Sequence, residues 1–293
     1  MEYKINFSSL FKVANIISLI AVLVSIFFLL FKGLNYGVDF KGGTLLEIRI
    51  DNPNIEIQDI RNSLKIKDLG DVNVKQFGKK GDFLIKFEKS SSDNDQFIGE
   101  LKEEISKSLN TEVNFRRVEN VGPKVSSELL KNGLTAIALS LAAMLFYIWI
   151  RFEWQFSLGS IIALIHDVII TLGIFSILSF EVNLSIVAAV LTIVGYSMND
   201  TVVIFDRIRE NLLKFSKIEI NEIANISINE TLSRTLITSL TTLVALLSIF
   251  ILGGEILKGF SFAMILGVII GTYSSVFVAS PVLNYFKVSQ KTL

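Results

Sequence analysis

The sequence predicts a multi-pass α-helical membrane protein with six spanning helices and one small α+β domain between the first and second of them. Hydrophobic residues make up 51% of the 293 positions, and the mean hydropathy is +0.56. Of the 56 charged residues, 34 lie within residues 32–131. Because the charge is confined to one section between long apolar runs, the chain combines a membrane part with one water-exposed domain.

The first apolar run covers residues 13–31. Its 19 residues make roughly 28 Å of helix, close to the hydrocarbon thickness of about 30 Å. Lys4 and Lys12 precede it, as in a secretory signal, but the run is longer than a usual signal core and no small-x-small cleavage site follows. We therefore expect an uncleaved signal anchor, with residues 1–31 forming a cytoplasmic N-terminus and the first membrane helix.

The charged section, residues 32–131, has the pattern of a small exported domain. Alternating apolar residues predict strands, and apolar residues at helical spacing predict helices. In order, the segments are a strand at 38–50 ended by Asp51, Asn52 and Pro53, a helix at 56–64, strands at 72–77 and 82–87 around a turn at 78–81, a helix at 97–109 and a strand at 113–118. This βαββαβ order predicts a ferredoxin-like domain. About 80 residues cannot form a deep catalytic cleft, which favours a binding module over an enzyme domain.

Five further apolar runs follow, each long enough to span a bilayer. They cover residues 132–150, 155–180, 182–205, 235–254 and 259–286. Residues 206–234 are expected to form a cytoplasmic loop, and residues 287–293 a cytoplasmic tail.

The distribution of lysine and arginine predicts the orientation of these spans. One side holds ten such residues in its short flanks, and the other holds only Lys258. The ten are Lys4, Lys12, Arg151, Arg207, Arg209, Lys214, Lys217, Arg234, Lys287 and Lys291. The positive-inside rule then places both termini in the cytoplasm and residues 32–131 outside.

Asp200 lies inside the fourth apolar run. A carboxylate near the bilayer centre costs at least about 2.5 to 3.5 kcal/mol, so it normally faces protein or water and marks an ion path. Its neighbours Ser197, Asn199 and Thr201 are polar. A polar stripe facing other protein follows from residues that recur at helical spacing, which are Ser197, Asp200, Ile204 and Arg207. Arg234 is the candidate cation, and a buried carboxyl group beside a movable arginine can bind and release a proton. The alternative is that Arg234 reaches the membrane surface while polar neighbours hydrogen-bond Asp200 for packing.

Two more ionisable residues, His166 and Asp167, lie midway along the third apolar run. Adjacent residues point about 100° apart on a helix, so these two need not face the same site. A proton relay and an interhelical hydrogen-bond pair are equally favoured. In the last run, Gly267, Gly271, Ser274 and Ser275 indicate a face for close helix packing.

Composition excludes several chemistries. The chain has no cysteine and a single histidine, so it cannot form a disulfide, a thiolate site or a histidine-based metal site. Its 28 basic and 28 acidic residues and its positive hydropathy argue against a nucleic-acid-coating protein. No motif places a nucleophile beside a base. We expect no metal, no cofactor, no nucleic-acid partner and no enzymatic activity.

A series of motifs gives the chain a resemblance to a known family. They are GVDFKGGT at 37–44, VGPKV at 121–125, HDV at 166–168, GYSMNDT at 195–201, DRIREN at 206–211, SRT at 233–235 and GTYSS at 271–275. Each is modest alone. In this order, on six helices with one exported domain, they resemble the SecF family, the smaller subunits of SecDF complexes and relatives of the RND proton-driven transporters.

The resemblance implies an accessory subunit of the Sec translocase in the bacterial cytoplasmic membrane. Such a subunit pairs with SecD beside the SecY, SecE and SecG channel, among membrane lipids. It uses the proton motive force to promote export of preprotein chains.

The resemblance also assigns residues. The family's proton site matches Asn199, Asp200 and Arg234 here, and the partner subunit supplies a further carboxylate. The motif at the start of the exported domain matches Asp39, Phe40, Gly42 and Gly43, where two glycines permit a tight crossing from helix into strand.

Two other functions remain open from the sequence. One is a half-sized, RND-like exporter of lipids or small molecules, although such exporters carry two large exported domains and this chain has one. The other is a structural scaffold of the translocon. A scaffold predicts that charge changes at Asp200 and Arg234 act only through folding.

Overall fold

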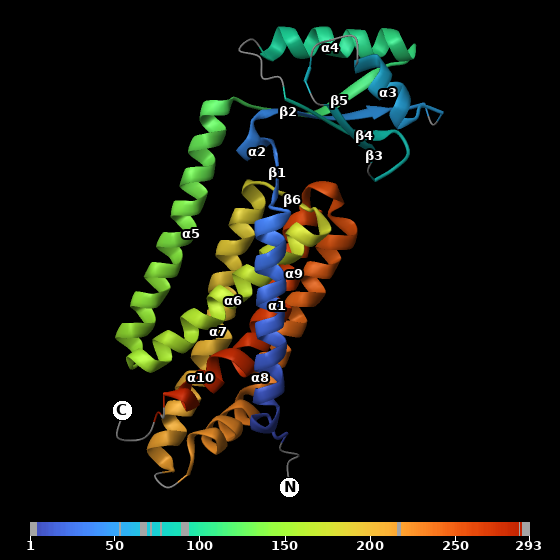
Figure 1. Cartoon of the computed structure of the whole chain (residues 1–293). Helices are drawn as coiled ribbons and strands as arrows, with labels where there is room; N and C mark the ends of the chain where they lie inside the picture. Colours follow the sequence, from blue (N-terminus) through green and yellow to red (C-terminus); the bar gives the residue numbers. More distant parts are fainter. Residues whose placement is uncertain are drawn as a thin grey trace. The chain divides into compact units, whose positions relative to one another are not determined.

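A computed structural model describes residues 5–52, 54–64, 69–70, 72–76, 78–88, 94–215, 218–286 and 288. It contains two compact units (Figure 1): a helical unit of Met1–Asn35 with Thr135–Leu293, and an α+β unit of Tyr36–Leu134. Several residues used in the sequence interpretation lie outside the described part. They are Lys4, Pro53, Phe77, Lys217 and the tail 287–293 apart from Val288.

The α+β unit contains one antiparallel sheet of four strands. Its elements are α2 (Val38–Lys41), β2 (Gly43–Ile50), α3 (Ile57–Leu64), β3 (Val72–Gln76), β4 (Asp82–Phe87), α4 (Asn94–Leu109) and β5 (Val113–Val121). The strand order β3-β4-β2-β5, with each neighbouring pair antiparallel, is that of a ferredoxin-like split βαβ domain. The predicted βαββαβ domain is therefore confirmed.

The core of this unit follows the alternation of the strands. Leu46 and Ile48 of β2 and Phe83 of β4 pack with Ile60 of α3 and Ile105 of α4, and all five are fully buried. The expected strand at 38–50 is interrupted, because α2 forms one helical turn before β2 begins. Gly42 and Gly43, with φ of +82° and +117°, make this break, and these are backbone angles that glycine adopts readily.

The helical unit contains the membrane-spanning elements. They are η1 (Ser8–Leu10), α1 (Phe11–Phe31), α6 (Trp154–Leu178), α7 (Leu184–Lys214), α8 (Ile220–Leu252), α9 (Gly254–Ser274), the π-helical turn η2 (Ser275–Ala279) and α10 (Ser280–Tyr285). A further helix, α5 (Pro123–Arg151), begins in the α+β unit and continues into the helical unit. Two short strands, β1 (Asn35–Tyr36) and β6 (Glu181–Val182), pair with each other. In the described chain, six helical stretches are long and apolar enough to cross a membrane. The prediction of six spanning helices is confirmed.

The expected loop at 206–234 is wrong as a description of the backbone. α7 continues to Lys214 and α8 begins at Ile220, so most of this segment is helical. The two helix extensions pair with each other: Arg207 Nε donates to Glu230 Oε2 at 2.7 Å, and Asn211 Nδ2 donates to Ser227 Oγ at 2.9 Å. The polar residues therefore mark the end of the apolar run and not the end of the helix.

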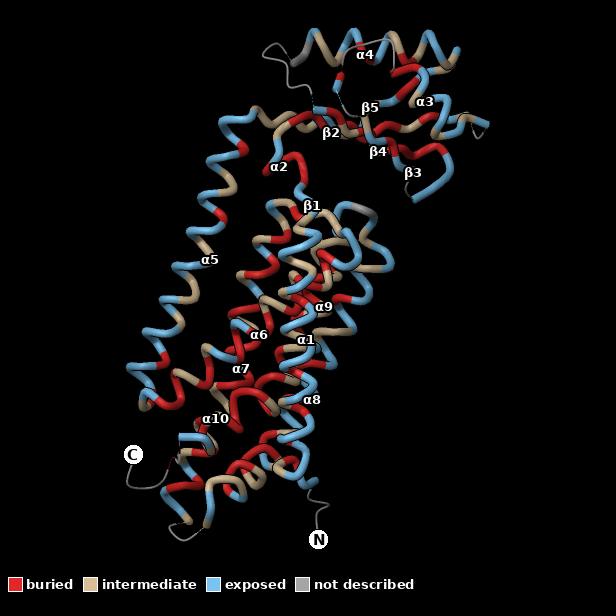
Figure 2. The backbone as a smooth tube through the Cα atoms, viewed as in Figure 1, coloured by how far each residue is buried: buried red, intermediate tan, exposed pale blue. Residues whose placement is uncertain are grey.

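Burial separates the spans into two groups. α6, α7 and the C-terminal span are the more buried spans, whereas few residues are buried in the spans formed by α1, α5 and α8 (Figure 2). The last span also carries the predicted packing face. A Cβ atom on Gly267 would overlap the side chain of Ile193, so α9 and α7 are in contact at that glycine. The prediction of close packing there is confirmed.

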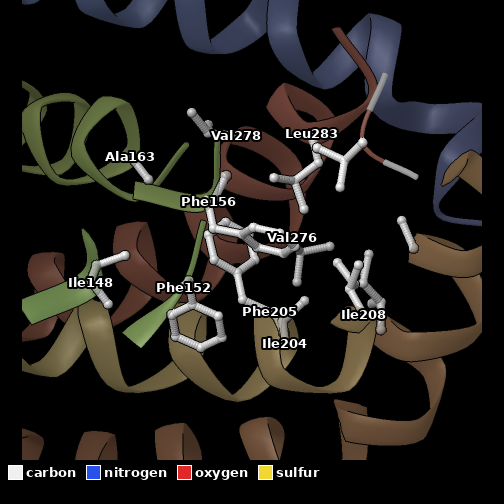
Figure 3. Packing of buried hydrophobic residues seen from close by; sticks show 14 of the residues in the cluster. Ile148, Phe152, Phe156, Ala163, Ile204, Phe205, Ile208, Val276, Val278 and Leu283 are labelled. Atoms are coloured by element: carbon white, nitrogen blue, oxygen red, sulfur yellow. The ribbon is translucent and has the colours of Figure 1, made fainter. Parts of the chain in front are cut away.

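A large apolar cluster holds α6, α7 and the C-terminal span together (Figure 3). Phe156 of α6 and Phe205 of α7 are fully buried, and their rings meet edge to face with centroids 5.2 Å apart. Val276 and Leu283 of the last span pack in the same cluster. Such close-packed aromatic contacts leave little freedom, so this cluster fixes the part of α7 that follows Asp200.

Candidate functional site

Asp200 lies on α7 where that helix meets α8 and α9, and its side chain is buried. Thr272 Oγ1 of α9 is 3.5 Å from Asp200 Oδ2, the outer limit for a hydrogen bond. The same threonine oxygen lies 2.7 Å from Ser239 Oγ of α8. One long hydrogen bond compensates poorly for burial of a carboxylate, so this group is suited to binding a proton or a cation.

Arg234 and Asn199, the other two residues expected at this site, are both exposed within the chain. No ion pair among the described residues joins Arg234 to Asp200, although the arginine is near enough for its charge to act on that carboxylate. Oγ1 of Thr235, the residue after Arg234, is buried and has no hydrogen-bond partner among the described residues. The structure thus shows no pairing of Arg234 with Asp200 among the described residues, and Asn199, the residue before Asp200, is exposed.

Asp167 of α6 is the centre of a hydrogen-bond network with no exposed surface. Ser197 Oγ of α7 and Ser274 Oγ of α9 both donate to its Oδ2, at 2.6 and 2.8 Å. His166 Nδ1 lies 2.8 Å from Asp167 Oδ1. The two adjacent residues therefore do meet, because the imidazole reaches back to the neighbouring carboxylate. A single carboxylate joins three helices.

The network continues through His166 to α1. The imidazole stacks on the ring of Tyr273, with centroids 6.2 Å apart and an interplanar angle of 23°. Tyr273 Oη donates to the carbonyl oxygen of Ala14 at 2.8 Å and lies 3.0 Å from Ser18 Oγ. His166 Nε2 is buried and has no hydrogen-bond partner among the described residues. This group of side chains connects four of the spanning helices.

Sequence reasoning found the acids of this region but missed their partners. The sequence indicates Ser197 only as part of a polar stripe and Ser274 only as a small packing residue. Thr272 and Tyr273 belong to the motif at 271–275, which does not predict their contacts. Hydroxyl side chains inside apolar runs were the available signal, since such groups need hydrogen-bond partners in a membrane. The sequence alone could not say which acid each one meets.

The glycine pair of the α+β unit lies where β2 begins. A Cβ atom on Gly43 would be 2.5 Å from the carbonyl oxygen of Phe87, at the end of β4. Phe40 of α2 is buried, and the charge of Asp39 acts on Lys86 of β4. Burial and nearby Lys75 lower the pKa of Lys86 to about 8, and Asp39 partly opposes this shift. The motif thus ties α2 to the central strands.

Two family models match the chain. One, described as "Protein export membrane protein SecD/SecF, C-terminal", matches residues 101–289. The other, described as "SecD/SecF GG Motif", matches residues 27–53, which include the glycine pair. The chain belongs to the SecD/SecF family. This family comprises membrane proteins of protein export, so the chain is a transport protein and not an enzyme.

Relatives within the SecD/SecF family cover nearly all of the chain. It is 44% identical over 282 residues to the protein translocase subunit SecF of Rickettsia bellii, covering 96% of this chain and 93% of that protein. It is 45% identical over 284 residues to the protein translocase subunit SecF of Vibrio alginolyticus, covering 95% of this chain and 89% of that protein. None of these names supports the alternative of a lipid or small-molecule exporter.

Solved structures of SecDF share the fold. The crystal structure of SecDF from Thermus, described as a translocon-associated membrane protein, superposes with a TM-score of 0.87 at 36% identity, covering 98% of this chain. SecDF in its super-membrane-facing form gives a TM-score of 0.73 at 35% identity. The chain spans only 39% of each of these longer SecDF chains.

Proposed function

We propose that this protein-export subunit works with SecD, beside the SecY, SecE and SecG channel, and uses the proton motive force to promote movement of preprotein chains out of the cell. Family membership supports the role in export. The SecDF chains that share the fold are more than twice as long as the matched region, which supports a SecD-type partner for this chain.

The observation that carries the proton-coupled part is the poorly compensated Asp200 carboxylate at the junction of α7, α8 and α9. Protonation of Asp200 removes its attraction to the nearby but unpaired Arg234, and the three helices repack. One proton crossing about 150 mV supplies roughly 3.5 kcal/mol, which is enough to bias a two-state switch. The exported α+β domain, linked to this unit by α1 and α5, moves in response.

We also propose the location and orientation of the chain. The protein lies in the bacterial cytoplasmic membrane, surrounded by lipid, with both termini in the cytoplasm and residues 32–131 outside. Six spans place both ends on one side, and the excess of lysine and arginine in the flanks on that side supports the orientation.

The decisive experiment measures gradient-driven export in membrane vesicles that carry Asp200→Asn. Asparagine has the size of aspartate but cannot exchange a proton. We expect loss of the gradient-dependent part of export at normal protein level. Asp206→Asn is the matched control, because Asp206 lies on the same helix, is partly exposed and pairs with Arg151 at 2.7 Å. Full export with Asp200→Asn would refute proton coupling at this residue, and loss explained by low protein level would favour the scaffold function.

A further inference from the structure

The Asp167 network lies next to the proposed proton site and is not used by the mechanism above. Ser197 precedes Asp200 by three residues on α7, and Ser274 follows Thr272 by two residues on α9. Both serines donate to the same oxygen, Oδ2 of Asp167. The two helices that carry Asp200 and Thr272 are therefore both hydrogen-bonded to one acceptor on a third helix, α6.

The packing around this acceptor leaves α7 and α9 little freedom to adjust. A Cβ atom on Gly271 would lie 2.9 Å from Cβ of Ser197, closer than real Cβ contacts allow. Because the helices already touch there, α7 and α9 cannot move closer together to replace hydrogen bonds that are lost at Asp167. The Asp200–Thr272 distance of 3.5 Å is at the limit of a hydrogen bond, so a displacement of a fraction of an ångström alters it.

The backbone next to Ser274 is irregular. The π-helical turn η2 begins at Ser275, and Ser280 Oγ donates to the carbonyl oxygen of Ser275 at 2.9 Å. Such turns are rare within helices and occur frequently at functional sites. Here the turn begins immediately after Ser274, the residue that donates to Asp167.

We propose that Asp167 is a positioning residue for Asp200, acting through its hydrogen bonds and not through a proton of its own. It holds α7 and α9 at the spacing that puts Thr272 within reach of Asp200. His166 supports the carboxylate from the same helix and, through Tyr273, joins this group to α1. The inference rests on the proposed function of Asp200 and adds a residue on another helix.

Asparagine distinguishes positioning from proton transfer at residue 167. Its amide oxygen can accept both serine hydroxyls, and its amide nitrogen can donate to the other tautomer of His166. Alanine removes the acceptor altogether and leaves the serines and the histidine without it. A positioning role therefore survives Asp167→Asn and fails with Asp167→Ala, whereas a relay fails with both.

The test compares gradient-driven export in vesicles containing the full chain, its SecD partner and the channel. We expect Asp167→Asn to stay within about threefold of the unaltered chain, and Asp167→Ala to lose about tenfold, equivalent to ~1.4 kcal/mol. A double change, Ser197→Ala with Ser274→Ala, should lose a similar amount while the acid remains. The matched control is Ser160→Ala with Ser261→Ala, two buried serines that donate only to carbonyl groups of their own helices.

Two results would overturn the inference. One is an Asp167→Asn chain as inactive as Asp167→Ala, which would assign a proton or charge role to Asp167. The other is a Ser197 and Ser274 double variant no worse than the control pair. If Asp167→Ala fails to accumulate, the double-serine variant decides, because it removes only two hydroxyl groups. Asp200→Asn is assayed in parallel, since its full activity would refute the proposed function separately.

Discussion

Asp167 and Asp200 are both buried carboxylates on adjacent helices, yet their surroundings differ. Within the described part of the chain, Asp167 has three close polar partners, whereas Asp200 has a single hydrogen bond of 3.5 Å. A carboxylate with several close donors is stabilised in one state, and a carboxylate with few can change state at little cost. This contrast supports the proposed exchangeable role of Asp200 and the proposed positioning role of Asp167.

A third buried acid, Asp82, lies in the soluble domain at the start of β4. Arg49 of β2 donates to both of its carboxylate oxygens, at 2.7 and 2.6 Å. This guanidinium, assisted by the charge of Arg116, lowers the pKa of Asp82, although burial acts in the opposite direction. The ionised form is thus favoured in the folded domain.

We predict that Asp82 makes the domain sensitive to acid. Because the folded pKa is depressed, the stabilisation is complete above the ordinary aspartate value of about 4 and is lost as the pH falls through the lowered folded value. The pH dependence of stability is measured by thermal unfolding of the purified chain, with proteolytic cleavage within β2 and β4 as the signal that the soluble domain has unfolded. Asp82→Asn should be less stable near neutral pH and should lose less on acidification. Asp51→Asn, at an exposed position, is the control, and equal acid sensitivity in all three chains would contradict the prediction.

At the level of elements, the sequence identified the six spans and the order of the soluble domain, because both follow from simple periodicities of apolar residues. It misplaced the ends of α7 and α8, since the loss of apolar character at 206–234 was interpreted as loss of helix. Both helices continue through this segment, and Arg207 of α7 pairs there with Glu230 of α8. It also missed α2, whose single turn is too short to show a period.

The same limit applies to the site. The acids were identifiable because charge is rare in a span, but their partners come from other helices. Ser274 and Thr272 could be placed beside Asp167 and Asp200 only when the packing of α9 against α6 and α7 was known.

The junction between α2 and β2 gives a prediction at the scale of one element. Gly43 has φ of +117°, and a Cβ atom there would meet the Phe87 carbonyl oxygen at 2.5 Å. Gly43→Ala should destabilise the soluble domain by about 2 kcal/mol or more, the usual cost of such backbone strain. Gly99→Ala on α4 is the control, since a Cβ atom there meets nothing within 4 Å. It should stabilise by up to about 1 kcal/mol, as alanine favours helix. Thermal unfolding of the two variants measures the difference. A Gly43→Ala chain as stable as the Gly99→Ala chain would contradict the prediction.

At the scale of the whole molecule, polar contacts and exposure follow the division of the spans. The more buried α6, α7 and C-terminal span carry the two acids and most of their partners, while α1, α5 and α8 present apolar residues outward. An apolar exterior is expected where lipid or another membrane subunit covers a helix. The charged side chains of the helical unit are concentrated near the ends of the spans, where Arg151 pairs with Asp206 and Arg207 pairs with Glu230.

The orientation of the chain can be tested directly because it contains no cysteine, so a single introduced cysteine is the only thiol. Lys107→Cys places a thiol on the exposed face of α4, and Lys214→Cys places one at the end of α7. If the lysine and arginine distribution sets the orientation, a membrane-impermeant maleimide labels residue 107 on intact spheroplasts and residue 214 only after permeabilisation. The cysteine-free chain is the blank. The reverse pattern would place the soluble domain in the cytoplasm, and it would also refute the proposed coupling, because an outward pull on a preprotein requires that domain to lie outside.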